Sequence, residues 1–191
     1  MKKVIALLAL FSVAVFAQNT FTDPRDGKKY KTVKIGNQTW MAENLNYATS
    51  DSKCYDNNPA NCAKYGRLYS WDEARKTCPK DWHLPNKKEW EALVNLAGGD
   101  NAAGKKLKSI GGWDGKDDGT DEYGFSALPG GGGNPDDRFS LVGKVGIWWS
   151  ASDIENKSGF AYSQGMNFGN DIAGWLHNVK SSLYSVRCVQ D

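Results

Sequence analysis

The segment Gly159-Phe-Ala-Tyr-Ser-Gln-Gly-Met-Asn-Phe-Gly-Asn-Asp-Ile-Ala-Gly-Trp-Leu-His177 contains two short runs of apolar and alternating residues, and Asn, Gly and Asp separate them. Runs of this length with turn residues between them are typical of neighbouring strands in an antiparallel sheet. Similar runs occupy residues 138–142, 146–150 and 183–189. The carboxyl-terminal part of the chain therefore predicts an antiparallel sheet.

Two short helices are predicted before this sheet. Ser70 followed by Glu73 matches a capping box, which opens a helix that ends near Thr77. Asn86 followed by Glu89 opens a second helix, whose apolar residues recur at helical spacing before a Gly-Gly pair ends it. Residues 102–110 predict one or two further helical turns.

The remaining segments complete an α+β pattern. Residues 30–35 alternate as in a half-buried strand, Gly36-Asn37 interrupts them, and residues 38–40 resume the pattern, which predicts a hairpin. Residues 111–133 are rich in glycine and acidic residues and predict a long irregular region. The order of elements favours an α+β domain whose last strand returns beside the first.

The amino terminus predicts export. Lys2 and Lys3 precede an apolar run that ends in Val15-Phe16-Ala17, the pattern of a secretory signal peptide over residues 1–17. A single domain is then expected over residues 18–191. No second apolar stretch reaches the roughly 18 residues of a membrane span. We expect an exported protein that is secreted, periplasmic or associated with the cell surface.

The charge balance narrows the possible partners. The chain has 24 basic and 22 acidic side chains, and without Lys2 and Lys3 the two signs balance. Nucleic acids and anionic membranes attract proteins with a basic excess. We therefore expect neither as the partner.

Four cysteines in an exported chain predict a disulfide framework with three possible connectivities. We favour Cys54 with Cys62, which encloses a turn-rich segment, and Cys78 with Cys188, which ties a helix end to the last strand. The cysteines do not form two close pairs and the two histidines stand alone, which disfavours zinc.

Several blocks of the sequence resemble the Fibrobacter succinogenes major paralogous domain. They include Ile35-Gly-Asn-Gln-Thr-Trp-Met-Ala-Glu-Asn-Leu-Asn-Tyr47, Tyr65-Gly-Arg-Leu-Tyr-Ser-Trp71, Trp82-His-Leu-Pro85, Trp148-Trp-Ser-Ala-Ser152 and Ser185-Val-Arg-Cys-Val189. The resemblance covers nearly all of the chain after residue 17. It implies an exported or surface protein of a fibre-degrading bacterium with a role in adhesion, and no enzymatic activity follows from it.

A more distant similarity links three of these regions to the formylglycine-generating sulfatase-modifying fold. The regions are Leu84-Pro-Asn-Lys-Lys-Glu-Trp90, the Trp148-Trp149 strand and Val186-Arg-Cys-Val189. The similarity implies a C-type-lectin-like architecture with two short helices, an antiparallel sheet and long irregular loops. The reactive thiol pair of that enzyme is absent, because no cysteine lies between Trp149 and Cys188.

Aromatic residues carry the main functional hypothesis. Most of the eight tryptophans lie in regular elements and are expected in the core, whereas Trp113 and Trp175 are surrounded by Gly, Asp and Asn, as in an exposed loop. Exposed flat rings beside amides and carboxylates suit a sugar ring. Packing within the loop is the favoured interpretation of each ring, and carbohydrate binding by these two tryptophans is the functional hypothesis. It includes nearby polar residues that would bond the sugar hydroxyls: Asn134, Asp137, Asn167, Asn170 and Asp171.

Five acidic residues lie close together in the irregular region: Asp114, Asp117, Asp118, Asp121 and Glu122. They do not fit an EF-hand, because Lys116 and Phe125 occupy ligand positions. Calcium in an irregular loop is a possible cofactor, and a solvated turn is the simpler alternative.

The leading hypothesis is a non-enzymatic module that recognises a plant cell-wall polysaccharide or another surface glycan. One alternative is a cell-surface structural or assembly protein that binds partner proteins. A second alternative is a weak hydrolase that uses the acidic loop, since glycosidases need paired carboxylates. His83 is expected at a helix entry, and His177 in a strand or loop.

Overall fold

The structure is a computed structural model that describes residues 19–116 and 118–190. The expected signal peptide, residues 1–17, lies outside the described residues. The helical elements are η1 (Tyr55–Asn57), α1 (Pro59–Tyr65), α2 (Trp71–Thr77), α3 (Lys87–Leu96), α4 (Ala103–Leu107) and η2 (Asp114–Lys116). The strands are β1 (Asn19–Thr22), β2 (Lys29–Ile35), β3 (Gln38–Met41), β4 (Leu68–Tyr69), β5 (Gly130–Gly133), β6 (Phe139–Val142), β7 (Val145–Asp153), β8 (Phe160–Asn167), β9 (Ala173–Val179), β10 (Tyr184–Ser185) and β11 (Val189–Gln190).

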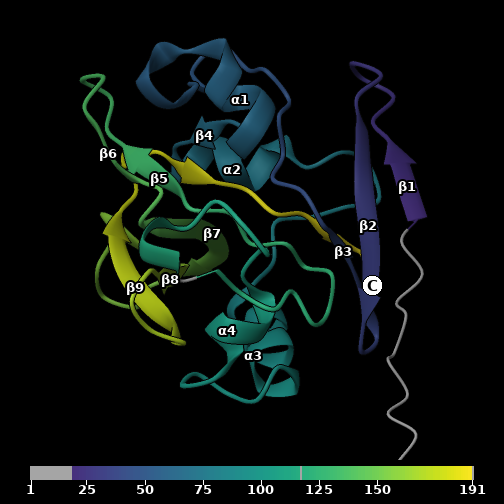
Figure 1. Ribbon diagram of the computed structural model, residues 1–191. Coiled ribbons are helices and arrows are strands. Elements are labelled where there is room, and N and C mark those ends of the chain that lie inside the picture. The colour runs from purple at the N-terminus through teal and green to yellow at the C-terminus, as the bar shows by residue number, and fades with distance from the viewer. Residues whose placement is uncertain (1–18, 117, 191) are drawn as a thin grey trace, which may run out of the picture.

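Two sheets organise these strands. The first is antiparallel with the order β1-β2-β3-β11, and the second joins β4, β10, β7, β5 and β6 and adds β8 and β9 beside β7. In Figure 1 the first sheet stands on one side of the molecule, α1 and α2 lie at one end and α3 and α4 at the other. Strand β9 forms the outer edge of the second sheet, because it pairs only with β8 among the described residues. The fold is therefore α+β, as the sequence predicts.

The predicted amino-terminal hairpin is confirmed. Ile35 pairs with Gln38 across the two-residue turn, and Val33 pairs with Trp40. The chain end also returns to this sheet, where Val189 pairs with Trp40. The last strand therefore lies beside the second strand of the hairpin, and the run predicted over residues 183–189 is divided between β10 and β11.

The helix predictions are partly correct. Asn86 and Glu89 form the expected capping box at the start of α3. The Ser70 side chain makes no capping bond at α2, and the N–H of Trp71, the first helical residue, donates to the carbonyl of Lys180. Helix α1 lies partly within the segment for which only turns were expected, and the Asn58 side chain caps it.

The prediction of a purely antiparallel sheet is wrong. Strand β7 pairs antiparallel with β8, but it runs parallel to β5 and to β10. Strand β5 consists of four glycines, Gly130–Gly133, at the end of the region expected to be irregular. The backbone of Ser140 and the Tyr55 ring leave no room for a Cβ at Gly131, so only glycine fits this close approach.

Both predicted disulfides are present, Cys54–Cys62 and Cys78–Cys188. The second links the end of α2 to the segment before β11 across 110 residues. The expected core positions of six tryptophans are also confirmed, since all are buried: Trp40, Trp71, Trp82, Trp90, Trp148 and Trp149. Together they fill the space between the helices and the two sheets.

Candidate functional site

A buried polar cluster links the segment after β3, strand β7 and the segment before β11. The Asn44 carboxamide oxygen accepts hydrogen bonds from Trp148 Nε1 at 2.8 Å and from Arg187 Nε and Nη2 at 3.0 and 2.7 Å. Arg187 Nη1 donates to the carbonyls of Met41 and Phe125. Burial lowers the pKa of the Arg187 guanidinium to about 9, so the group stays charged at neutral pH. The cluster uses its polar groups to hold the fold together.

Trp113 lies in the core. The residue is only 5% exposed, and its indole N–H donates a hydrogen bond to the Ala127 carbonyl at 3.1 Å. The ammonium of buried Lys108 lies 4.9 Å from the ring. Burial of a large indole with a paired N–H is more favourable in free energy than leaving it in solvent. The loop therefore folds back over the core. The exposed position predicted for Trp113 is therefore wrong.

Trp175 lies half-buried in β9, in a strand and not in a loop. The rings of Tyr162 and Trp175 pack edge to face, with their centroids 5.6 Å apart. The Tyr162 ring packs in the same way against His177, with a centroid distance of 5.0 Å. Directly paired residues share a face of a sheet. We call the aromatic face the ring and apolar side chains that this register places on one side of the two strands: Phe160, Tyr162, Trp175, His177 and Val179. Buried Gln164, which pairs directly with Trp175, lies on the same side.

The aromatic face combines flat rings with hydrogen-bond donors. Phe160 and Val179 are 39% and 46% exposed. Lys87, at the start of α3, holds its ammonium 4.7 Å from the Tyr162 ring centre and 5.7 Å from that of Trp175. Rings can stack against the C–H face of a sugar, while an ammonium and an imidazole bond its hydroxyl groups.

Three predicted polar residues lie at the turn between β8 and β9. Asn167 ends β8 and is exposed. The Asn170 side chain accepts a bond from the Ile172 N–H, and the Asp171 carbonyl accepts one from Gly104 of α4. This turn leads directly into the strand that carries Trp175, but the bonded oxygen of Asn170 stabilises the turn.

Asn134 and Asp137 lie elsewhere. The Asn134 side chain accepts bonds from the backbone N–H groups of Asp136 and Arg138, and Asp137 forms an ion pair with Lys53. Pro135 of their turn lines the same cleft as Val179, at the end of β9, whereas Asn167, Asn170 and Asp171 border the start of that strand. A strand of this length separates the two groups by about 20 Å. The structure therefore does not gather the predicted residues into one site.

A cleft of about 780 Å³ opens where the aromatic face ends, since Gly159 and Val179 line it. Lys53 and Lys180 also line it and form ion pairs with Asp137 and Asp153. Residues that carry hydroxyl or carboxylate groups also line it: Ser50, Asp51, Ser70, Asp72, Ser158 and Ser181. The volume lies within the usual range for sites of small ligands.

Sequence reasoning missed Tyr162 and the cleft. Tyr162 occupies an ordinary alternating strand, and only its pairing with His177 places it beside Trp175. The cleft is assembled from segments near residues 50, 70, 135, 158 and 180. No local pattern identifies such a combination.

The described acidic-loop residues make separate local contacts. Asp118 accepts a bond from the Trp113 N–H, Asp121 accepts two from Ser126, and Glu122 pairs with Lys106 at 3.7 Å. Asp114 is exposed, and Asp117 lies outside the described residues. Among the residues that the structure describes, no three metal-ligating side chains form a group suited to an ion.

Residues 33–190 match the Fibrobacter succinogenes major domain, and the chain belongs to this family. No curated protein matches the sequence, and no solved structure matches it. Within the described part of the chain, no helix is both long and apolar enough to cross a membrane.

Proposed function

We propose that this protein is an exported, non-enzymatic module that binds a plant cell-wall polysaccharide or another surface glycan. The observation that carries the proposal is the aromatic face of β8 and β9, where Trp175 and Tyr162 remain half-buried beside His177. Rings with an apolar body and a polar edge suit a ligand with C–H faces and hydroxyl groups.

The cleft supports the same proposal. A glycan on the aromatic face would reach Val179 and Gly159, where the cleft begins. The hydroxyl groups of Ser70 and Ser158 and the carboxylate of Asp72 offer donors and acceptors to a side branch or a chain end. Extended binding along the face and into the cleft would give specificity without a catalytic step.

Affinity electrophoresis tests this function directly. The mature protein is run through gels that contain soluble cellulose derivative, xylan or no polysaccharide. Retardation by at least one polysaccharide, reversed by free oligosaccharide of the same type, is the expected result. Equal mobility in every gel, together with no signal on a glycan array, would contradict the proposal.

A second candidate function is assembly through partner proteins at the cell surface. The outer edge of β9 favours it, because this seven-residue strand pairs with β8 alone among the described residues. An open strand edge can accept a strand from another chain. A partner protein would then shift the sedimentation of the domain, and polysaccharide would not.

We further infer a C-type-lectin-like architecture. Support comes from the return of β11 to the amino-terminal sheet and from the Cys78–Cys188 bridge, which fixes that return. An experimental structure compared with lectin-like domains tests the inference. The two disulfides also support export, since such bonds persist in oxidising compartments. Fractionation of the producing cells tests this location.

A further inference from the structure

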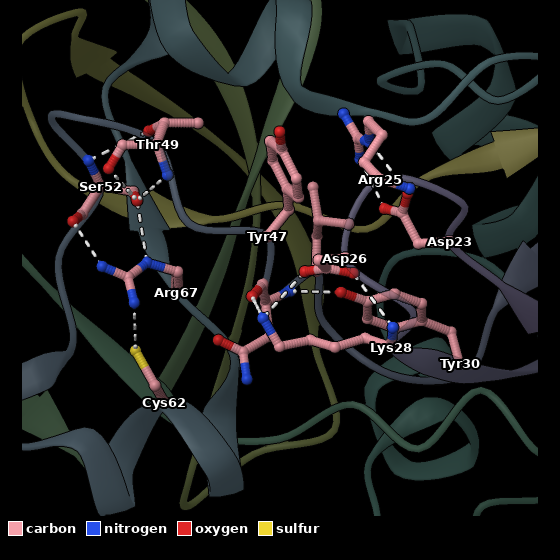
Figure 2. Close-up of polar contacts among 12 residues, drawn as sticks. Asp23, Arg25, Asp26, Lys28, Tyr30, Tyr47, Thr49, Ser52, Cys62 and Arg67 are labelled. Atoms are coloured by element: carbon pink, nitrogen blue, oxygen red, sulfur yellow. Dashed lines mark hydrogen bonds and ion pairs between the residues drawn. The ribbon is translucent and has the colours of Figure 1, made fainter.

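We propose that Cys54–Cys62 is a thiol-exchange site at which a small anionic thiol forms a mixed disulfide, assisted by Arg67. Arg67 Nη1 lies 3.7 Å from Cys54 Sγ and 3.6 Å from Cys62 Sγ. Figure 2 shows the guanidinium between the sulfur of Cys62 and the backbone of Ser52. A cation at this distance stabilises a thiolate that forms on either sulfur.

The guanidinium is held in place by the preceding loop. Arg67 Nε donates to Ser52 Oγ at 2.8 Å, and Nη2 donates to the Ser52 carbonyl at 2.9 Å. Ser52 is itself fixed by Thr49, with which it exchanges side-chain and backbone hydrogen bonds (Figure 2). Arg67 therefore presents its charge to the disulfide without first giving up conformational freedom.

The surroundings of Cys62 add positive charge. Cys62 lines a cavity of about 200 Å³ whose other lining residues include Lys28, Lys29 and Lys64. Lys28 pairs with Asp26, and the Glu43 carboxylate in the same wall accepts the Lys31 N–H. The cavity raises the local concentration of anions and stabilises a thiolate at Cys62.

The exchange can be written as a balanced reaction. A thiolate attacks Sγ of Cys54, which is more exposed than Cys62. A new S–S bond forms at Cys54, the Cys54–Cys62 bond breaks, and its electron pair leaves on Cys62 as a thiolate beside Arg67. A second thiol can then displace Cys54, so that two thiols supply two electrons and leave as their own disulfide. A leaving thiol of lowered pKa departs faster.

The second disulfide provides the internal contrast. Cys188 is fully buried in the core cluster with Trp71 and Trp149. Within the described residues, no cationic side chain bonds to either sulfur of Cys78–Cys188. The Arg25 guanidinium donates to the carbonyl of neighbouring Thr77, so these sulfurs lack the direct guanidinium contact that favours exchange at Cys54.

The test is timed exposure of the native protein to excess reduced glutathione, followed by alkylation and peptide mass spectrometry. We expect a glutathione adduct on Cys54 while Cys78–Cys188 stays intact. Arg67→Gln should slow adduct formation roughly threefold to tenfold. Arg67→Lys should restore most of the rate, and Lys88→Gln, which removes an exposed charge on α3 at the other end of the domain, should leave it unchanged.

Circular dichroism on the same samples shows whether each variant remains folded. Reaction at Cys78–Cys188 first would overturn the proposal. So would an Arg67→Gln variant that reacts as fast as the native protein or faster. A variant in which Lys29 and Lys64 are both changed to Gln tests the role of the cavity. Its rate of adduct formation should fall more with anionic glutathione than with mercaptoethanol, a neutral thiol. An equal fall with both thiols would show that the cavity does not attract the anion.

Discussion

The Asn44 cluster and the aromatic face contain the same kinds of side chains in different surroundings. In the cluster, the amide, the Arg187 guanidinium and the Trp148 indole bond to one another inside the core. On the aromatic face, Trp175 and Tyr162 contact each other by their rings and keep part of their surface in solvent. The comparison teaches that aromatic and amide content does not distinguish a structural cluster from a candidate binding face, whereas exposure and hydrogen-bond use do.

The largest effect is expected from Asn44→Leu. This change leaves the buried Arg187 charge and the Trp148 N–H without their shared acceptor, so the free energy of unfolding should fall by about 3 to 5 kcal/mol. Urea unfolding measures it. Asn167→Leu, at the exposed end of β8, is the control and should change stability by less than about 0.5 kcal/mol. Similar losses for both variants would show that the cluster has no special structural role.

Trp113→Ala should behave like a core mutation. Loss of a buried indole is expected to lower the free energy of unfolding by about 3 to 5 kcal/mol. Trp175→Ala, from the half-buried aromatic face, should cost clearly less in the same denaturation experiment. If the two variants were equally stable, the division between core and surface tryptophans would be wrong.

Local hydrogen bonds and chain-wide contacts differ in how far the sequence predicts them. The cap formed by Asn86 and Glu89 was predictable because the two residues contact each other within one turn. The similar Ser70 pattern begins a helix but makes no side-chain cap, and the first helical N–H, that of Trp71, bonds to Lys180, far along the chain.

The tryptophans show the same dependence on distant residues. Trp113 and Trp175 have similar neighbours in sequence and contact the same core cluster, but Trp113 is buried in it with its N–H bonded to Ala127, whereas Trp175 packs against it and stays partly exposed. The sequence therefore predicts the α+β class and the disulfide pairs, while the position of the candidate site depends on contacts that local patterns do not contain.

The ion pair between Asp23 and Arg25, which lies between core and surface, predicts that the stability of the fold depends on pH. Asp23 is buried and accepts bonds from the half-exposed Arg25 (Figure 2). Burial opposes ionisation, but the bonds from Arg25 outweigh it and hold the pKa of Asp23 below its usual value. Since the folded state binds fewer protons, this contribution is present above the unfolded pKa of about 3.9 and is lost as the pH falls through the folded pKa.

Asp23→Asn should therefore lower stability by about 1.5 to 3 kcal/mol at neutral pH. The difference from the native protein should shrink as the pH falls through the folded pKa of Asp23, which lies below its usual value. Chemical denaturation at a series of pH values measures this. A difference that stays constant from neutral to strongly acidic pH would contradict the assigned ion pair.

The smallest effect is expected from calcium at the acidic loop. If Asp114 and its neighbours bind the ion, calcium at ten times its dissociation constant adds about 1.4 kcal/mol of stability and raises the melting temperature. Magnesium at the same concentration is the control. A melting temperature that neither calcium nor chelator changes would identify the loop as a solvated turn.

The central claim is that the aromatic face binds glycan, and affinity electrophoresis of Trp175→Ala tests it most directly. Loss of one stacking ring should weaken retention by the polysaccharide that retards the native protein. The expected loss is about 1 to 3 kcal/mol, borrowed from bases stacked on aromatic rings, or about 5- to 150-fold in affinity. Leu141→Ala, an exposed apolar truncation on β6, should retain native affinity. Unchanged retention of a folded Trp175→Ala variant would contradict the claim.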